Sequence, residues 1–107
     1  MELIPIEQVG VEIFHHFSPG RYTKETRIPA GEILLQHKHK LSHDSVLIKG
    51  VAIVTVDGVS MQYMAPHALT IPAGKVHAVM AVTDVVWYCL FETDETDPGK
   101  IDHEVVA

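Results

Sequence analysis

Apolar and polar residues alternate in short runs along most of the chain, with turn residues between the runs. A period of two is typical of β-strands that bury one face, because successive side chains point to opposite sides of a strand. Pro-Gly, Pro-Ala-Gly and Asp-Gly sequences separate the runs and predict turns. The strand-like runs cover residues 11–17, 21–28, 33–35, 46–48, 51–56, 59–64, 68–71, 76–82 and 85–91. With no amphipathic helix of any length, this pattern predicts an all-β sandwich or barrel.

Four of these runs allow more specific predictions. Asp57-Gly58 joins the runs 51–56 and 59–64, and Asp-Gly favours a two-residue type I′ hairpin because glycine accepts a positive φ. Residues 21–28 alternate charged and uncharged side chains, which predicts an edge strand or a half-exposed strand. The last run places Trp87, Cys89 and Phe91 on one face, and that face is predicted to be core or pocket wall.

Four histidines are spaced for metal binding. His37, His39 and His43 lie within seven residues, and His77 follows the Pro-Ala-Gly turn at 72–74. On a strand, His37 and His39 point the same way about 7 Å apart, close enough to bind one ion with bonds of about 2.1 Å. On a helix the same pair would diverge by about 200°. The spacing therefore predicts an extended segment that contributes to a metal site.

The spacing also resembles the two sequence motifs of the cupin family. The first motif, G-x5-H-x-H-x3/4-E-x6-G, is matched by Gly31, His37, His39 and Gly50. The second, G-x5-P-x-G-x2-H-x3-N, is matched by Pro72, Gly74 and His77. Together the motifs cover residues 31–81, about half the chain. The sequence departs from them at His43, Pro66 and Ala81, where cupins usually carry glutamate, glycine and asparagine.

The resemblance implies a single-domain jelly-roll β-barrel, the double-stranded β-helix of the cupins. It also implies that His37, His39, His43 and His77 bind one divalent metal, as in small cupins with a four-histidine site for manganese, iron or nickel. Zinc favours a closed tetrahedral shell, whereas manganese, iron and nickel leave two of six positions open, and copper also accepts imidazole. The resemblance favours manganese or iron, with nickel, copper or zinc as alternatives.

Replacing the usual glutamate with His43 changes the charge of the predicted site. Four neutral imidazoles cancel none of the charge of a divalent ion, so the ion should bind an anionic enolate, carboxylate or hydroxide more strongly. Without a metal, the same four residues would have to be buried neutral imidazoles, each with its own hydrogen-bond partners. That arrangement is less plausible than one shared ion. The remaining residues near the motif and the isolated histidines are expected to be surface or turn residues: Lys38, Lys40, Asp44, His15, His16, His67 and His103.

Composition limits the class of protein. The 107 residues predict one domain, with a core over residues 11–91 and an acidic tail over 92–107 that holds six of the 14 acidic residues. Eight basic residues leave a formal charge of −6, which disfavours nucleic acid as a partner. The chain has no basic stripe and no long apolar run, which disfavours a membrane. The single Cys89 and an N-terminus without signal-peptide features predict a cytoplasmic protein. The cupin resemblance implies a homodimer and a small-molecule substrate.

Three functions remain open on the sequence. The first is a metal-dependent oxygenase, of dioxygenase type, acting on a small anionic molecule with an enol, phenol or alkene group. The second is a non-catalytic module that binds metal or a small ligand, and the third is an isomerase or lyase that uses the metal as a Lewis acid. Tyr63, Tyr88 and Glu92 are candidates for an acid or base at the barrel mouth, although packing or surface positions explain them equally well. Cys89 is disfavoured as a nucleophile because no basic residue lies near it in the sequence.

Overall fold

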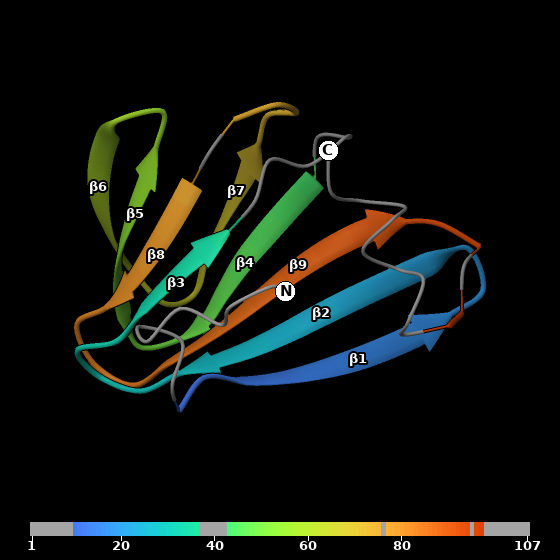
Figure 1. Ribbon diagram of the computed structural model, residues 1–107, viewed down its shortest axis with the longest axis horizontal. Helices are drawn as coiled ribbons and strands as arrows, with labels where there is room; N and C mark the ends of the chain where they lie inside the picture. The colour runs from blue at the N-terminus through green and yellow to red at the C-terminus, as the bar shows by residue number, and fades with distance from the viewer. Residues whose placement is uncertain (1–9, 37–42, 76, 95, 98–107) are drawn as a thin grey trace, which may run out of the picture.

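Two antiparallel β-sheets form the protein in the computed structural model, which describes residues 10–36, 43–75, 77–94, 96 and 97 (Figure 1). Each strand-like run in the sequence overlaps one strand of the structure. The strands are β1 (Glu12–Ser18), β2 (Arg21–Ile28), β3 (Ile33–Gln36), β4 (His43–Lys49), β5 (Val51–Val56), β6 (Val59–Met64), β7 (His67–Ile71), β8 (His77–Ala81) and β9 (Val85–Glu92). None of the described residues belongs to a helix that is long and apolar enough to span a membrane.

The order of the strands is that of a jelly roll. The larger sheet has the order β1-β2-β9-β4-β7, and the smaller has the order β3-β8-β5-β6. Strands that are far apart in the sequence pair along their length, as β2 does with β9 and β3 with β8. The prediction of an all-β jelly roll is confirmed.

Residues 21–28 were predicted to form an edge strand or a half-exposed strand, and the structure rules out the edge position. β2 is an interior strand, because β1 pairs with it on one side from Glu12 to Ser18 and β9 pairs with it on the other side. Its burial is mixed rather than strictly alternating, with Glu25 and Thr26 both buried. Charged residues on the outer face of a strand do not reveal its neighbours, since a paired strand can face water on one side.

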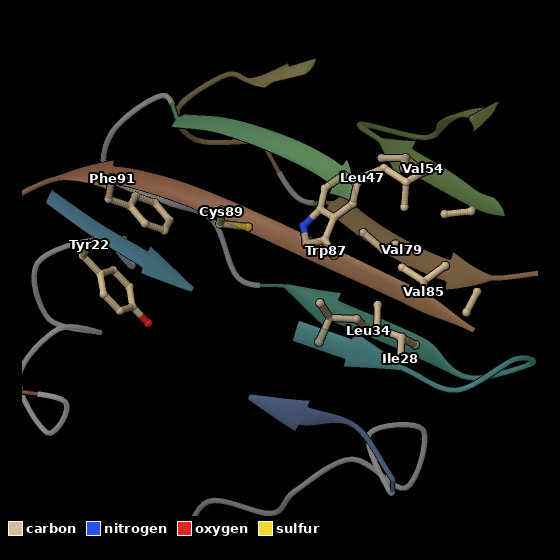
Figure 2. Close-up of a cluster of buried hydrophobic side chains, with 12 residues drawn as sticks. Tyr22, Ile28, Leu34, Leu47, Val54, Val79, Val85, Trp87, Cys89 and Phe91 are labelled. Atoms are coloured by element: carbon tan, nitrogen blue, oxygen red, sulfur yellow. The ribbon is translucent and has the colours of Figure 1, made fainter. Parts of the chain in front are cut away.

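The core lies between the inner faces of the two sheets. β9 alternates buried and more exposed residues along its whole length, and it supplies four inward side chains, including the fully buried Trp87. Figure 2 shows these side chains meeting others from β2, β4, β5 and β8 across the interior. The prediction that Trp87, Cys89 and Phe91 share a core or wall face is confirmed.

The β5–β6 hairpin follows its turn chemistry. Asp57 and Gly58 both have positive φ, 51° and 82°, as a type I′ turn requires at its two central residues. The strands pair in register from Val56 opposite Val59 to Val51 opposite Met64. The hairpin predicted from Asp-Gly is therefore confirmed.

The interior of the barrel has two different ends. We call the end where β4 and β8 begin, at His43 and His77, the histidine end. The opposite end, which we call the turn end, contains the connections at residues 29–32, 50 and 82–84. These connections are hydrogen-bonded to one another: Gly31 N donates to Ala81 O over 2.8 Å, and Ala30 N donates to an Asp84 carboxylate oxygen over 2.9 Å. Gly50 has φ +93° and lies so close to the Asp84 carbonyl that a Cβ there would overlap it.

Candidate metal centre

Two of the four predicted ligands are buried side by side at the histidine end. His43 is the first residue of β4 and His77 is the first residue of β8, so each sheet contributes one ring. Their exposed fractions are 4% and 1%, and their ring centroids lie 5.8 Å apart with the ring planes tilted by 46°. Alternation along each strand places both residues on the inner face, with Ser45 and Val79 as the next inward residues.

This separation fits one shared ion. An imidazole nitrogen bonds a metal at about 2.1 Å, so the ion lies roughly 3 Å from each ring centre and two ligating rings are at most about 6 Å apart. The observed 5.8 Å is within that limit. Burial also suits metal binding. It favours the neutral form of an imidazole, and the neutral form is the one that binds metal. The two described rings are therefore close enough to share one divalent cation.

The other two predicted ligands, His37 and His39, lie outside the described residues. The strand that leads to them is described: β3 ends at Gln36, which pairs with His77 in β8. Gln36 is thus the register partner of His77, and His43 follows Gln36 seven positions later in the sequence. Over residues 10–36, 43–75, 77–94 and 96–97, no group of three or more His, Cys, Asp or Glu side chains is arranged to hold a metal. The four-histidine set stays a prediction.

An aromatic wall lies beside the histidine pair. The Phe91 ring is 4.6 Å from the His43 ring, and the Tyr22 ring is 5.9 Å from Phe91 on its other side. Phe17 continues the row at 5.1 Å from Tyr22. Figure 2 shows Tyr22 and Phe91 extending from neighbouring strands at the same end of the core. These rings place apolar aromatic surface beside the candidate centre.

Sequence reasoning missed the hydrogen bond between His15 and Tyr22. The Tyr22 hydroxyl oxygen and His15 Nδ1 are 2.6 Å apart, although Tyr22 is 1% exposed and His15 lies on the exposed part of β1. The expectation that His15 is a surface residue is confirmed, but its ring has a specific partner. The local sequence indicated only that Tyr22 and Ile28 lie on the same face of the run 21–28. The charged Lys24 falls on that face too, so the pattern did not identify the face as buried.

A cleft of about 710 Å³ lies at the strand ends near His43. Strand alternation assigns its residues Thr23, Asp44, Thr70 and Leu90 to the outer face of the larger sheet. His43, Phe91 and Tyr22 belong to the inner face. The cleft therefore runs along the outside of the sheet and meets the interior only at the strand ends. Its charged residues are Arg21, Asp44 and Glu92, so it carries both signs of charge.

The predicted candidates for an acid or base lie apart from the histidine pair. Tyr88 is on the outer face of β9, where it is the register partner of Glu25. Tyr63 lies towards the turn end, opposite Ala52, and stacks on His67 at 4.3 Å. Glu92 alone of the three lines the cleft. Cys89 is fully buried, and Ser45 Oγ donates a hydrogen bond to its Sγ over 3.6 Å.

A carboxylate on the outer face has an unusual environment. Glu25 is only 6% exposed, because Arg27 Nε donates to one carboxylate oxygen over 2.7 Å and His16 Nε2 lies 2.9 Å from the other. The Arg27 guanidinium also lies 4.7 Å from the centre of the Phe14 ring. The hydrogen bond from Arg27, and then that from His16, hold the pKa of Glu25 below its ordinary value of 4.5. This network stabilises the outer surface and is distant from the candidate metal centre.

A pair of facing core residues each carries a buried polar atom without a hydrogen-bond partner among the described residues. They are Thr26 Oγ1 and Trp87 Nε1, and both residues are 0% exposed. Thr26 and Trp87 are register partners on the inner faces of β2 and β9. An unsatisfied buried polar group costs about 1–3 kcal/mol, so this pair makes the middle of the core less stable than an apolar pair of the same shape.

Comparison with known proteins supports the fold. No family model and no curated protein matches this sequence. Among solved structures, KdgF from a Halomonas species is 17% identical, with a TM-score of 0.71 and 83% of each chain covered. A cupin superfamily protein from Desulfitobacterium hafniense is 16% identical, with a TM-score of 0.70, and the match covers 87% of this chain and 92% of the other.

Salicylate 1,2-dioxygenase from Pseudoaminobacter salicylatoxidans is also similar. It is 13% identical with a TM-score of 0.72, and the match covers 90% of this chain but 28% of the dioxygenase. At such identities the likeness concerns the fold alone. The chain therefore has the cupin jelly-roll fold, with proteins of the cupin family among its structural neighbours.

Proposed function

We propose that this cupin-fold chain binds a divalent metal ion through His37, His39, His43 and His77. The observation that carries the proposal is the pair of buried imidazoles, His43 and His77, brought from two sheets to within 5.8 Å between ring centres. Two neutral rings at this distance inside a core are well placed to share a cation. Manganese or iron is the proposed metal, with nickel, copper and zinc as alternatives.

The proposed activity is oxygenase chemistry on a small organic anion with an enol, phenol or alkene group. When bound, manganese or iron supplies a Lewis acid and a redox-active centre. The chain supplies a neutral imidazole shell, which leaves the full positive charge of the ion to attract an anion. Salicylate 1,2-dioxygenase is named for this class of reaction and shares the fold, which supports the proposal. The aromatic wall of Tyr22 and Phe91 suits a flat apolar substrate body.

Metal analysis is the first test. We expect purified protein to contain about one equivalent of a transition metal by elemental analysis. His43→Ala and His77→Ala should each lower the metal content strongly, because each removes one ligand. His67→Ala is the matched control, because His67 is exposed and lies on β7 at the turn end. A protein that stays metal-free with manganese, iron, nickel, copper and zinc alike would overturn the proposal.

A charge-changing variant tests the substrate class. His43→Glu places an anionic donor in the shell, so the manganese- or iron-loaded variant should bind azide, a simple anion, more weakly than the wild type does. Titration followed by electron paramagnetic resonance measures this difference. Equal azide affinity in the two loaded proteins would show that the charge of the shell does not select the ligand.

Two alternative functions are separated by turnover. Oxygen consumption with enol, phenol or alkene carboxylates distinguishes an oxygenase from an isomerase or lyase, which changes the substrate without using oxygen. Metal binding without turnover of any substrate in such a panel would favour the non-catalytic binding module. The cytoplasmic location stays a prediction from the sequence.

A further inference from the structure

One lysine lies on the inward face of the larger sheet. Lys24 in β2 is the register partner of Cys89 in β9, and Cys89 is fully buried among the core side chains (Figure 2). Register partners in an antiparallel sheet project from the same face. Lys24 therefore lies on the inward face of β2, as Tyr22 and Thr26 do, and its side chain is half-buried.

Negative charge is absent from the same face. Strand alternation assigns every acidic residue of the nine described strands to an outward position: Glu12, Glu25, Asp44 and Glu92. The inward positions of these strands hold no arginine, and Lys24 is their one lysine. A chain with a net charge of −6 thus keeps its strand carboxylates outside and one ammonium group towards the interior. An anion that enters meets no like charge from these strands.

Lys24 has no ion-pair partner among the described residues. The ion pairs in that part of the chain are His16–Glu25, Arg27–Glu25 and Lys75–Asp57. A lysine drawn into a protein interior is usually paired, because removing an ammonium group from water without a counter-charge is unfavourable. Its register partner in β1 is His15, which carries no negative charge either.

The neighbourhood of Lys24 is open to solvent at the edge of the sheet. β1 is the edge strand, and its inward residues Ile13 and His15 are both exposed, Ile13 by 42%. His15 is held in place by its hydrogen bond of 2.6 Å with the Tyr22 hydroxyl group. An anion can therefore reach Lys24 from the side of β1.

Lys24 lies one row away from the candidate metal centre. Ring contacts define a first row across four strands, made of Phe17, Tyr22, Phe91 and His43. Register defines the next row, made of His15, Lys24, Cys89 and Ser45. The backbones of Lys24 and His43 are thus about 12 Å apart, from two strand spacings of about 4.8 Å across the sheet and two residues of about 3.4 Å along it. Both side chains extend inward over this gap, so one small molecule can contact both.

We propose that Lys24 binds a carboxylate group of the substrate, at the end of the substrate that lies away from the metal. The inference rests on the proposed function and narrows its substrate class. The substrate is then an organic acid whose carboxylate is separated from its enol or phenol oxygen by a flat apolar body, which packs against Tyr22 and Phe91. The hydrogen bond from an ammonium group to a carboxylate is charge-assisted, and it is stronger than a neutral one. A substrate that binds the metal through both groups would leave Lys24 without a contact.

Calorimetric titration of para-hydroxybenzoate into the manganese-loaded full chain tests the proposal. Lys24→Met keeps an apolar stem and removes the ammonium group, so it should weaken binding about 10- to 100-fold. Lys24→Arg should retain most of the affinity, because it keeps the charge. Phenol, which has no carboxylate, should show no difference between the wild type and Lys24→Met. Lys49→Met is the matched control, since it removes the same charge from an exposed position of β4, and it should bind para-hydroxybenzoate as the wild type does.

Equal affinity of the wild type and Lys24→Met for para-hydroxybenzoate overturns the assignment, because Lys24 would then only cover the core with its methylene groups. An equal loss in Lys49→Met overturns it too, since the effect would come from net charge, and so does a wild type that does not bind the probe. Circular dichroism checks that the variants are folded, and Lys24→Gln takes the place of Lys24→Met if the latter does not fold.

The metal proposal and the assignment of Lys24 can fail separately. If the protein takes up no metal, the same variants are compared with benzoate and the metal-free protein. Binding of benzoate that is lost in Lys24→Met would support the carboxylate site although the metal proposal had failed. Absent binding, or binding equal in both proteins, would end the assignment as well. If Lys24→Met retains the metal content of the wild type but binds para-hydroxybenzoate equally well, only the assignment of Lys24 fails.

Discussion

The barrel interior is lined by imidazole and aromatic rings at the histidine end. At the turn end it is lined by small aliphatic side chains and closed by backbone hydrogen bonds. His43, His77 and Phe91 lie at the first end, and Ala52, Ala81 and Val85 at the second. The turn end is closed by connections that bond to one another, such as Gly31 N to Ala81 O. One end thus holds buried imidazoles, and the other is closed by hydrogen-bonded connections.

The comparison separates stability from function. Residues at the turn end contribute packing and hydrogen bonds, so their substitution should unfold the protein. Residues at the histidine end contribute buried nitrogen atoms that an apolar core does not need, so their substitution should change binding more than folding. The four predictions that follow test this division, from the largest expected effect to the smallest.

Gly50→Ala should have the largest effect on stability. An alanine there would combine a positive φ with overlap of its Cβ with the Asp84 carbonyl, and we expect a loss of about 3 kcal/mol in the free energy of unfolding. Urea denaturation measures the loss. Gly20→Ala is the control at the histidine end, because Gly20 has φ +72° but nothing within 4 Å of a Cβ, and it should lose only about 1 kcal/mol. Equal losses would mean that the close approach at the turn end is unimportant.

Metal should stabilise the protein through the histidine end. Manganese or iron at a hundred times its dissociation constant should add about 2.7 kcal/mol to the free energy of unfolding, because it binds the folded state. Thermal unfolding with metal and with a chelator measures the gain. His77→Ala should abolish the gain while the chelated variant stays folded, and His67→Ala should retain it. A gain of the same size in His77→Ala would place the ion elsewhere.

Thr26→Val should stabilise the core between the two ends. The substitution removes a fully buried hydroxyl without a partner among the described residues, and we expect a gain of about 1 kcal/mol. Thr23→Val, on the outer face of the same strand, should give little change. Chemical denaturation compares the two variants, and a loss in Thr26→Val would show that the hydroxyl contributes a favourable interaction.

The smallest effect is expected on the outer surface, away from both ends. Hydrogen bonds from Arg27 and His16 lower the pKa of Glu25 below 4.5. The ionised carboxylate is therefore more favourable in the folded state than in the unfolded state. The resulting stability is present above pH 4.5 and is lost as the pH falls from there through the lower folded-state value. Urea midpoints measured on both sides of pH 4.5 should therefore fall less with acid in Glu25→Gln than in the wild type. Parallel pH profiles would contradict this assignment.

Much of the fold follows from local pattern. The Asp57-Gly58 hairpin and the inward row of β9 were predictable, because turn chemistry and a period of two act between neighbouring residues. The place of β2 inside the larger sheet was not, because pairing with β1 and β9 depends on residues far away in the sequence. The contact of His15 with Tyr22 was missed for the same reason, since it crosses between two strands.

The sequence by itself determined the strands, their turns and the histidine types and spacing that predict a metal centre. Only the tertiary structure decided that His43 and His77 meet and that Tyr63 and Tyr88 lie away from them. The physical reason is that alternation fixes which side of a strand a residue occupies. The folding of two sheets over one another fixes what that side faces.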